Sequence, residues 1–149
     1  MLAAYYSKGC DSKKMFSGLE IAQAPDFRQH LNKYDVIHID IQWFLANCEN
    51  ADEVVSFITK SVLDELREIY PGTLPTEVVK LPDALSRVKE KTGQKFIIII
   101  DEWDVLIRDG EVSEIIQDGY INFLRGMFKG TEPTKYIQLA YLTGILLKK

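Results

Sequence analysis

The stretch 96–100 is an unbroken run of five large apolar residues that leads directly into two adjacent carboxylates, Asp101 and Glu102. A strand with one face in water alternates apolar and polar side chains. An unbroken apolar run therefore predicts a strand buried on both faces, as in the middle of a parallel sheet. Ligands of open α/β sheets bind beyond the carboxyl ends of the strands. We therefore expect the two acids to lie at a functional edge.

Two neighbouring acids at the tip of a buried strand are costly to keep charged, because burial and mutual repulsion both disfavour the ionised forms. A divalent cation relieves both effects. One acid then reaches the metal or its water shell, and the other is free to act as a base. The pair thus indicates metal-assisted chemistry at the end of this strand.

Two further strands are predicted on either side of this one. Apolar and polar residues alternate from 35 to 43, which is typical of a strand with one exposed face near a sheet edge. Residues 136–143 are mostly apolar and predict a third strand. His38 and Asp40 share the polar face of the first strand. A metal pair is one interpretation, and a solvated or hydrogen-bonded polar face is the favoured one.

Helical patterns separate the strands. Apolar residues at helical spacing predict a helix over 51–70 and a broad apolar face over 113–128, and a further helix starts near Pro82 and ends at Gly93. Residues 105–111 are expected to form a loop. Connections of this length imply parallel pairing with right-handed crossovers. The predicted fold class is α/β, with 96–101 in the middle of the sheet and the other two strands on its two sides.

The composition excludes several classes of protein. The 149 residues fit one domain, and a net charge of −4 argues against a general nucleic-acid surface. Cys10 and Cys48 lie far apart without a CxxC spacing, so reduced thiols in a cytoplasmic protein are expected. We find neither a signal peptide at the start nor an apolar run of the roughly 18 residues that a membrane span needs.

Several segments resemble, in order along the chain, a bacterial family of AAA-ATPase-like proteins. The apolar run and its acids look like a Walker B strand with an acid after the metal-binding aspartate. The quoted segments are Leu2-Ala3-Ala4-Tyr5-Tyr6, Phe16-Ser17-Gly18-Leu19, Ile100-Asp101-Glu102-Trp103-Asp104, Asn122-Phe123-Leu124-Arg125 and Leu142-Thr143-Gly144-Ile145. The resemblance implies a three-layer remnant of a P-loop NTPase core.

The resemblance also implies roles for individual residues. Asp101 would hold Mg²⁺ through its water shell, and Glu102 would polarise the attacking water. Thr143 would lie as a polar sensor beside the γ-phosphate of ATP. Asp104 would be a supporting acid, and Arg125 would be either a charge stabiliser or, as the favoured interpretation, a surface arginine of its helix.

One departure from the family is large, because its GxxxxGK[ST] phosphate-binding loop has no counterpart in residues 1–149. In the family this loop would precede residue 2. We therefore expect a single partial domain over 1–149, truncated at both ends. Such a chain is expected to be inactive alone in ATP hydrolysis.

Two other functions stay open at this point. The first is a non-catalytic interaction module that keeps the fold of an NTPase. The second is a metal-dependent nuclease using the acids at 101, 102 and 104, although no lysine follows at a short E-x-K spacing. If a neighbouring strand is missing, an apolar edge at 136–143 is exposed and favours self-association.

Overall fold

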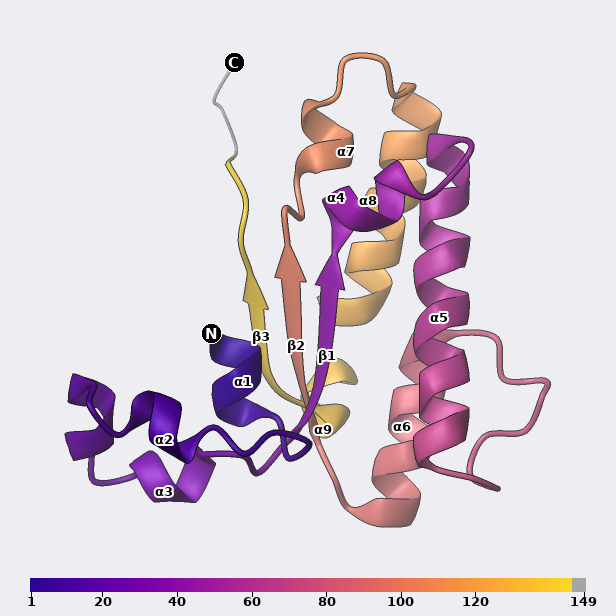
Figure 1. Cartoon of the computed structure of the whole chain (residues 1–149). Coiled ribbons are helices and arrows are strands. Elements are labelled where there is room, and N and C mark those ends of the chain that lie inside the picture. Colours follow the sequence, from indigo (N-terminus) through magenta and orange to yellow (C-terminus); the bar gives the residue numbers. More distant parts are fainter. Residues whose placement is uncertain (146–149) are drawn as a thin grey trace.

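A three-stranded parallel sheet organises the chain, and the computed structural model describes residues 1–145 of it. The strands are β1 (Asp35–Asp40), β2 (Phe96–Asp101) and β3 (Ile137–Leu142), in the order β1-β2-β3 (Figure 1). Both pairings are parallel, so the α/β fold and the central position of β2 are confirmed.

Helices connect the strands and precede the first one. In chain order they are α1 (Leu2–Tyr6), α2 (Lys13–Phe16), the 3-10 helix η1 (Glu20–Gln23), α3 (Phe27–His30), α4 (Ile41–Ala46), the 3-10 helix η2 (Ala51–Glu53), α5 (Val54–Ile69), α6 (Leu81–Thr92), α7 (Val105–Arg108), α8 (Glu114–Phe128) and α9 (Pro133–Tyr136). The three long helices, α5, α6 and α8, lie at the predicted positions.

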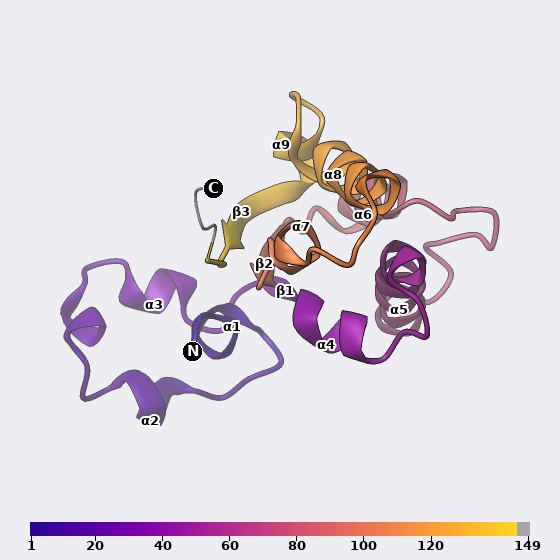
Figure 2. The ribbon, with the colours of Figure 1, turned by 90° about the horizontal axis from the view of Figure 1, so that it is seen from above.

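The helices form two unequal layers around the sheet. The long helices α5, α6 and α8 lie on one side, and the short helices α1 to α3 gather on the other side, near the amino ends of the strands (Figures 1 and 2). A small apolar cluster of Tyr5, Phe16 and Phe27 holds the short helices together. The second helical layer therefore covers only part of its face of the sheet.

Strand β2 is the most deeply buried element of the sheet. Its five apolar residues are all at most 5% exposed, whereas all six residues of β3 are partly or fully exposed. Phe96, Ile98 and Ile100 belong to the main core under the long helices, and Ile97 and Ile99 are buried on the opposite face. The predicted burial of this strand on both faces is confirmed.

The first strand is shorter than predicted, because it ends at Asp40 and not at residue 43. The Asp40 carboxylate accepts a hydrogen bond of 3.0 Å from the backbone N–H of Trp43. This side chain caps helix α4, whose residues Ile41 and Phe44 face the core at helical spacing. The alternation that continues to Trp43 in the sequence therefore bridges a strand and the first turn of a helix.

The predicted loop at 105–111 is also partly wrong, because residues 105–108 form the short helix α7. Val105 and Leu106 are buried there, and Asp104 accepts backbone hydrogen bonds from Ile107 and Arg108. Four residues are too short a span for a periodic apolar pattern, which explains why the sequence did not indicate this helix.

Within residues 1–145, no helix combines the length and the apolar character that crossing a membrane requires.

The burial of β2 predicts a large cost for shortening its side chains. Ile98→Ala removes a fully buried side chain that packs in the core under the long helices, so we expect a loss of about 2–5 kcal/mol in the free energy of unfolding. Ile115→Ala, at a side chain that is 85% exposed, is the matched control and should change stability by less than about 0.5 kcal/mol. Urea unfolding measures both, and similar losses in the two variants would contradict the assigned burial.

Candidate functional site

The candidate site lies at the carboxyl edge of the sheet, where β2 and β3 end side by side. Asp101 is the last residue of β2, and Thr143 follows the last residue of β3. The hydroxyl of Thr143 donates a hydrogen bond to Oδ1 of Asp101, and Nε2 of His38 on β1 lies 3.7 Å from Oδ2. The Asp101 side chain is about half exposed, so it remains open to solvent between its neighbours.

Glu102 occupies an unusual backbone conformation directly after the strand. Its φ angle is 51°, in the left-handed region that residues other than glycine seldom adopt. Strained residues of this kind cluster at active sites and switch regions. The chain remains attached to β3 beyond this turn, because the N–H of Trp103 donates to the carbonyl of Thr143 at 3.0 Å. At this left-handed turn the side chains of Asp101 and Glu102 diverge, so the two consecutive acids contact different neighbours.

Arg108 of helix α7 joins the second acid to a third. Its Nη2 lies 2.6 Å from Oε2 of Glu102, and its Nε lies 2.9 Å from Oδ2 of Asp104. Asp104 is fully buried, whereas the Glu102 side chain is 41% exposed. A buried carboxylate needs a charged partner, and Arg108 provides it from the same short helix.

Asp104 also fixes the segment that follows β3. Its Oδ1 accepts a hydrogen bond of 3.2 Å from the backbone N–H of Ile145. A Cβ atom on Gly144 would overlap the Asp104 carboxyl group, so only glycine allows this close approach. The Leu142-Thr143-Gly144-Ile145 segment is thereby held against the turn that carries Glu102.

Tyr120 supports the same turn from helix α8. Its hydroxyl donates a hydrogen bond of 2.7 Å to the carbonyl of Trp103, and the side chain is fully buried. Burial, together with the nearby negative charge of Asp104, raises the pKa of the Tyr120 phenol well above its usual value. The phenol therefore stays protonated and continues to donate.

The structure brings together three of the four predicted site residues. Asp101, Glu102 and Thr143 lie at one edge of the sheet, as described above. Arg125 lies in the last turn of α8, from which α9 leads to the amino end of β3, so it is at the opposite end of the sheet. The Arg125 side chain donates a 3.4 Å hydrogen bond to Oδ1 of Asn122 on the same helix, which fits a surface arginine.

Sequence reasoning missed Arg108 and Tyr120. The spacing of four residues between Asp104 and Arg108 would have indicated an ion pair if α7 had been predicted as a helix. No local signal could have indicated Tyr120, because it reaches Trp103 from a different helix. Asp40, considered with His38 as a metal pair, serves instead as the cap of α4.

The carboxyl edge offers separate acids rather than a complete set of metal ligands. No three His, Cys, Asp or Glu side chains within residues 1–145 converge as a ready-made metal cage. Mg²⁺ does not require such a cage, because it keeps several waters and takes one or two carboxylates together with substrate phosphates. Asp101 fits this requirement, since its carboxylate is half exposed and one oxygen accepts the Thr143 hydroxyl. The nuclease hypothesis gains no support from this geometry.

These features define an α/β protein with an acidic candidate site at the carboxyl edge of a parallel sheet, beside a hydroxyl on the next strand. The chain belongs to the AAA-ATPase-like family, whose model, described as "Predicted AAA-ATPase", matches residues 1–148. The resemblance that the sequence motifs indicated is thereby confirmed. Neither a curated protein nor a solved structure shows significant similarity to the chain.

The buried phenol predicts a pH-dependent contribution to stability. Tyr120→Phe should lower the free energy of unfolding at pH 8 by about 1–3 kcal/mol, because the Trp103 carbonyl loses its donor. The raised pKa of the folded state means that this contribution is complete below the unfolded pKa of about 10 and declines as the pH rises above it. The difference between wild type and variant should therefore shrink between about pH 9 and pH 11.

Urea unfolding at several pH values measures this difference. The matched control is Tyr141→Phe, at a side chain that is 46% exposed, which should change stability by less than about 0.5 kcal/mol. A loss for Tyr120→Phe that stays constant over the pH range would contradict the assigned role of the buried phenol.

Proposed function

We propose that this chain is the acid-bearing part of a cytoplasmic, bacterial ATPase domain that binds ATP with Mg²⁺. The observation that carries the proposal is the contact between two neighbouring strand ends, where Thr143 donates to Asp101. Glu102 follows directly in a strained left-handed turn. Membership of the AAA-ATPase-like family supports the same function.

In the proposed mechanism each residue at this edge has a separate task. Asp101 holds Mg²⁺ through its water shell, and the ion supplies charge stabilisation for the phosphates when it is bound. Glu102 polarises the attacking water, and Thr143 orients Asp101 and senses the γ-phosphate. Asp104 and Arg108 hold the turn in place. Arg125 has no task in this mechanism, because it lies at the other end of the sheet.

Residues 1–149 supply no phosphate-binding loop of GxxxxGK[ST] type, and such a loop normally holds the β- and γ-phosphates. We therefore propose that a segment outside residues 1–149 provides the loop. The acids described here then complete the site from the side of β2 and β3. Alone, the chain is expected to bind Mg-ATP very weakly and to hydrolyse none.

The proposal is tested in two steps. Calorimetry on residues 1–149 should detect little or no binding of Mg-ATP, and submicromolar affinity would contradict the need for the loop. In a longer protein that contains the loop, Glu102→Gln should reduce turnover roughly hundredfold or more while leaving ATP binding intact. Glu90→Gln, at an exposed residue of α6, is the control. Unchanged turnover in Glu102→Gln would remove Glu102 from the mechanism.

A second candidate function is that of an interaction module, and the exposed edge of the sheet favours it. Leu139, Tyr141 and Leu142 of β3 are between 37% and 46% exposed. An apolar strand at the end of a sheet, with unpaired backbone groups, can pair with another chain. We propose that copies of residues 1–149 associate through β3.

Sedimentation over a range of concentrations tests this association. Tyr141→Lys should shift the protein towards monomer, because a charge on the edge strand opposes pairing. Ile115→Lys, at an exposed position of α8, should leave the association unchanged. A wild-type protein that is monomeric at all concentrations, or equal effects of both substitutions, would rule out the β3 edge as the interface.

A further inference from the structure

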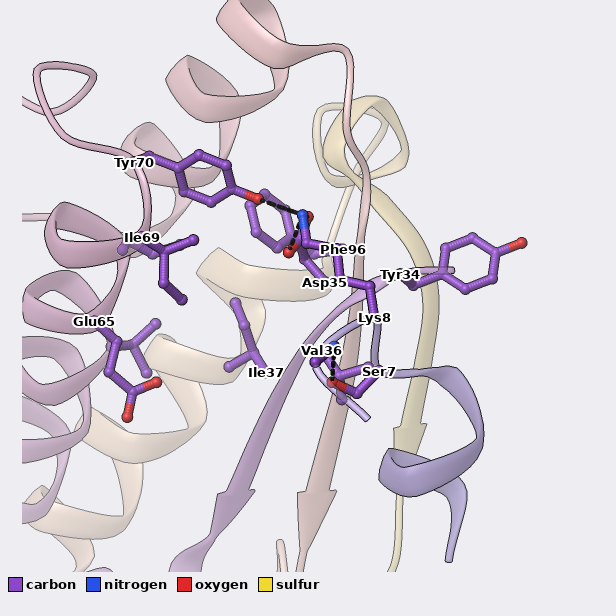
Figure 3. A pocket seen from close by; sticks show the side chains of 13 residues that line it. Ser7, Lys8, Tyr34, Asp35, Val36, Ile37, Glu65, Ile69, Tyr70 and Phe96 are labelled. Carbon is purple, nitrogen blue, oxygen red and sulfur yellow. Dashed lines mark hydrogen bonds and ion pairs between the residues drawn. The ribbon is translucent and has the colours of Figure 1, made fainter. Parts of the chain in front are cut away.

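A groove lies beside β1, at the opposite end of the sheet from the acids. It encloses about 570 Å³ between the start of β1, the end of helix α5 and the segment 7–9 (Figure 3). Its apolar lining comes from both the sheet and the helix, and includes Val36, Leu66, Ile69 and Phe96. A cavity of this size accommodates one or two large apolar side chains or a small ligand.

The polar side chains of the groove are largely occupied with one another. Nζ of Lys8 lies 2.8 Å from Oδ2 of Asp35, and the Tyr70 hydroxyl donates to the same oxygen at 2.6 Å (Figure 3). Burial alone would lower the pKa of Lys8, but the hydrogen bonds to Asp35 and Tyr70 outweigh it and raise the pKa. These three groups therefore form a closed cluster. Glu65 is exposed at the groove and has no ion-pair partner among residues 1–145.

The backbone at the outer edge of β1 provides the remaining hydrogen-bonding groups. The N–H of Tyr34 donates to the Tyr6 carbonyl at 2.9 Å, and the N–H of Lys8 donates to the Tyr34 carbonyl at 2.9 Å, so residues 6–8 run parallel to the start of this edge. Backbone groups of successive strand residues point to alternate sides. The backbone N–H and C=O groups of Val36 and His38 therefore point to the same side as the N–H and C=O of Tyr34, away from β2.

The short pairing with residues 6–8 stops before it reaches Val36. Within residues 1–145, neither Val36 nor His38 makes a backbone hydrogen bond on this outer side. An edge strand with open donors and acceptors is a template for another strand. The groove thus combines an apolar cavity with the backbone pattern that recognises an extended chain.

We propose that this groove binds an extended peptide segment of a partner protein, which adds a strand to the outer edge of β1. The free groups are backbone amides and carbonyls in a row, which a peptide strand matches and a compact small molecule does not. A large apolar side chain of the segment enters the cavity beside Ile69. A basic residue of the segment faces Glu65, a charged lining residue that has no ion-pair partner within residues 1–145. The proposal does not depend on ATP hydrolysis at the other end of the sheet.

The probe is the synthetic peptide acetyl-Lys-Val-Phe-Val-Lys-amide, titrated into ¹⁵N-labelled chain. Binding should shift the amide signals of Val36 and His38 and slow their hydrogen exchange, while the signals of 139–142 stay unchanged. Ile69→Ser should weaken binding about tenfold, because it removes an apolar contact of the cavity. Ile115→Ser, at an exposed isoleucine of α8, should bind like wild type.

Two N-methylated peptides distinguish strand pairing from simple apolar contact. One is methylated at both valine nitrogens and the other at the phenylalanine nitrogen. If the peptide pairs with β1 as a strand, one of the two methylated peptides loses at least about tenfold in affinity, because the N–H groups that face β1 are blocked. The other methylated peptide keeps its affinity, because its methyl groups face away from β1. Equal affinities of the two methylated peptides, or no binding of the parent peptide, would overturn the proposal. Amide shifts at Val36 and His38 that follow protein concentration alone would assign the groove to a second copy and also overturn it.

Discussion

Complete burial of β2 between β1 and β3 is the constraint on which the rest of this structure depends. A strand without an exposed face cannot carry charged side chains along its length, so the charges begin only where the strand ends. Asp101 marks that end and lies in register with Asp40 of β1. The carboxyl ends of β1 and β2 therefore place two carboxylates side by side, whereas the apolar length of β2 serves the core.

The acids at the carboxyl edge of the sheet have three different surroundings. Asp101 is half exposed beside a hydroxyl, Glu102 is partly exposed in a left-handed turn, and Asp104 is fully buried. Arg108 compensates the buried charge and reaches Glu102 as well. Asp101 faces solvent, whereas Glu102 is held by the Arg108 guanidinium. Two carboxylates in such different surroundings can perform different tasks.

The two ends of the sheet differ in what they offer to a ligand. The carboxyl edge presents carboxylate oxygens, which suit a cation and the phosphates that accompany it. The groove at the start of β1 presents an apolar cavity and open backbone groups, and its side-chain charges are mostly paired internally. A partner bound there would contact the carboxyl-terminal part of α5 and segment 7–9, which lie towards the amino ends of the strands (Figure 1).

Much of the fold was predictable from the sequence, because burial leaves a local signature. The apolar run at 96–100, the apolar stripes of α5 and α8 and the mostly apolar third strand each reflect the side that faces the core. The bounds of β1 were not predictable in the same way. Asp40 ends that strand through one side-chain hydrogen bond to Trp43, and the alternating pattern continues past this point without interruption.

The sequence by itself determined the parallel α/β class, the central strand, and the placement of Asp101, Glu102 and Thr143 at strand ends, since these features depend on neighbouring residues. Only the tertiary structure decided which distant groups complete the edge. Arg108 lies close in sequence, but its ion pairs with Glu102 and Asp104 depend on the short helix α7. Tyr120 reaches the turn from α8, and Arg125 lies at the far end of that helix. Such contacts depend on how the helices pack on the sheet, and the spacing of residues along the chain carries no record of that packing.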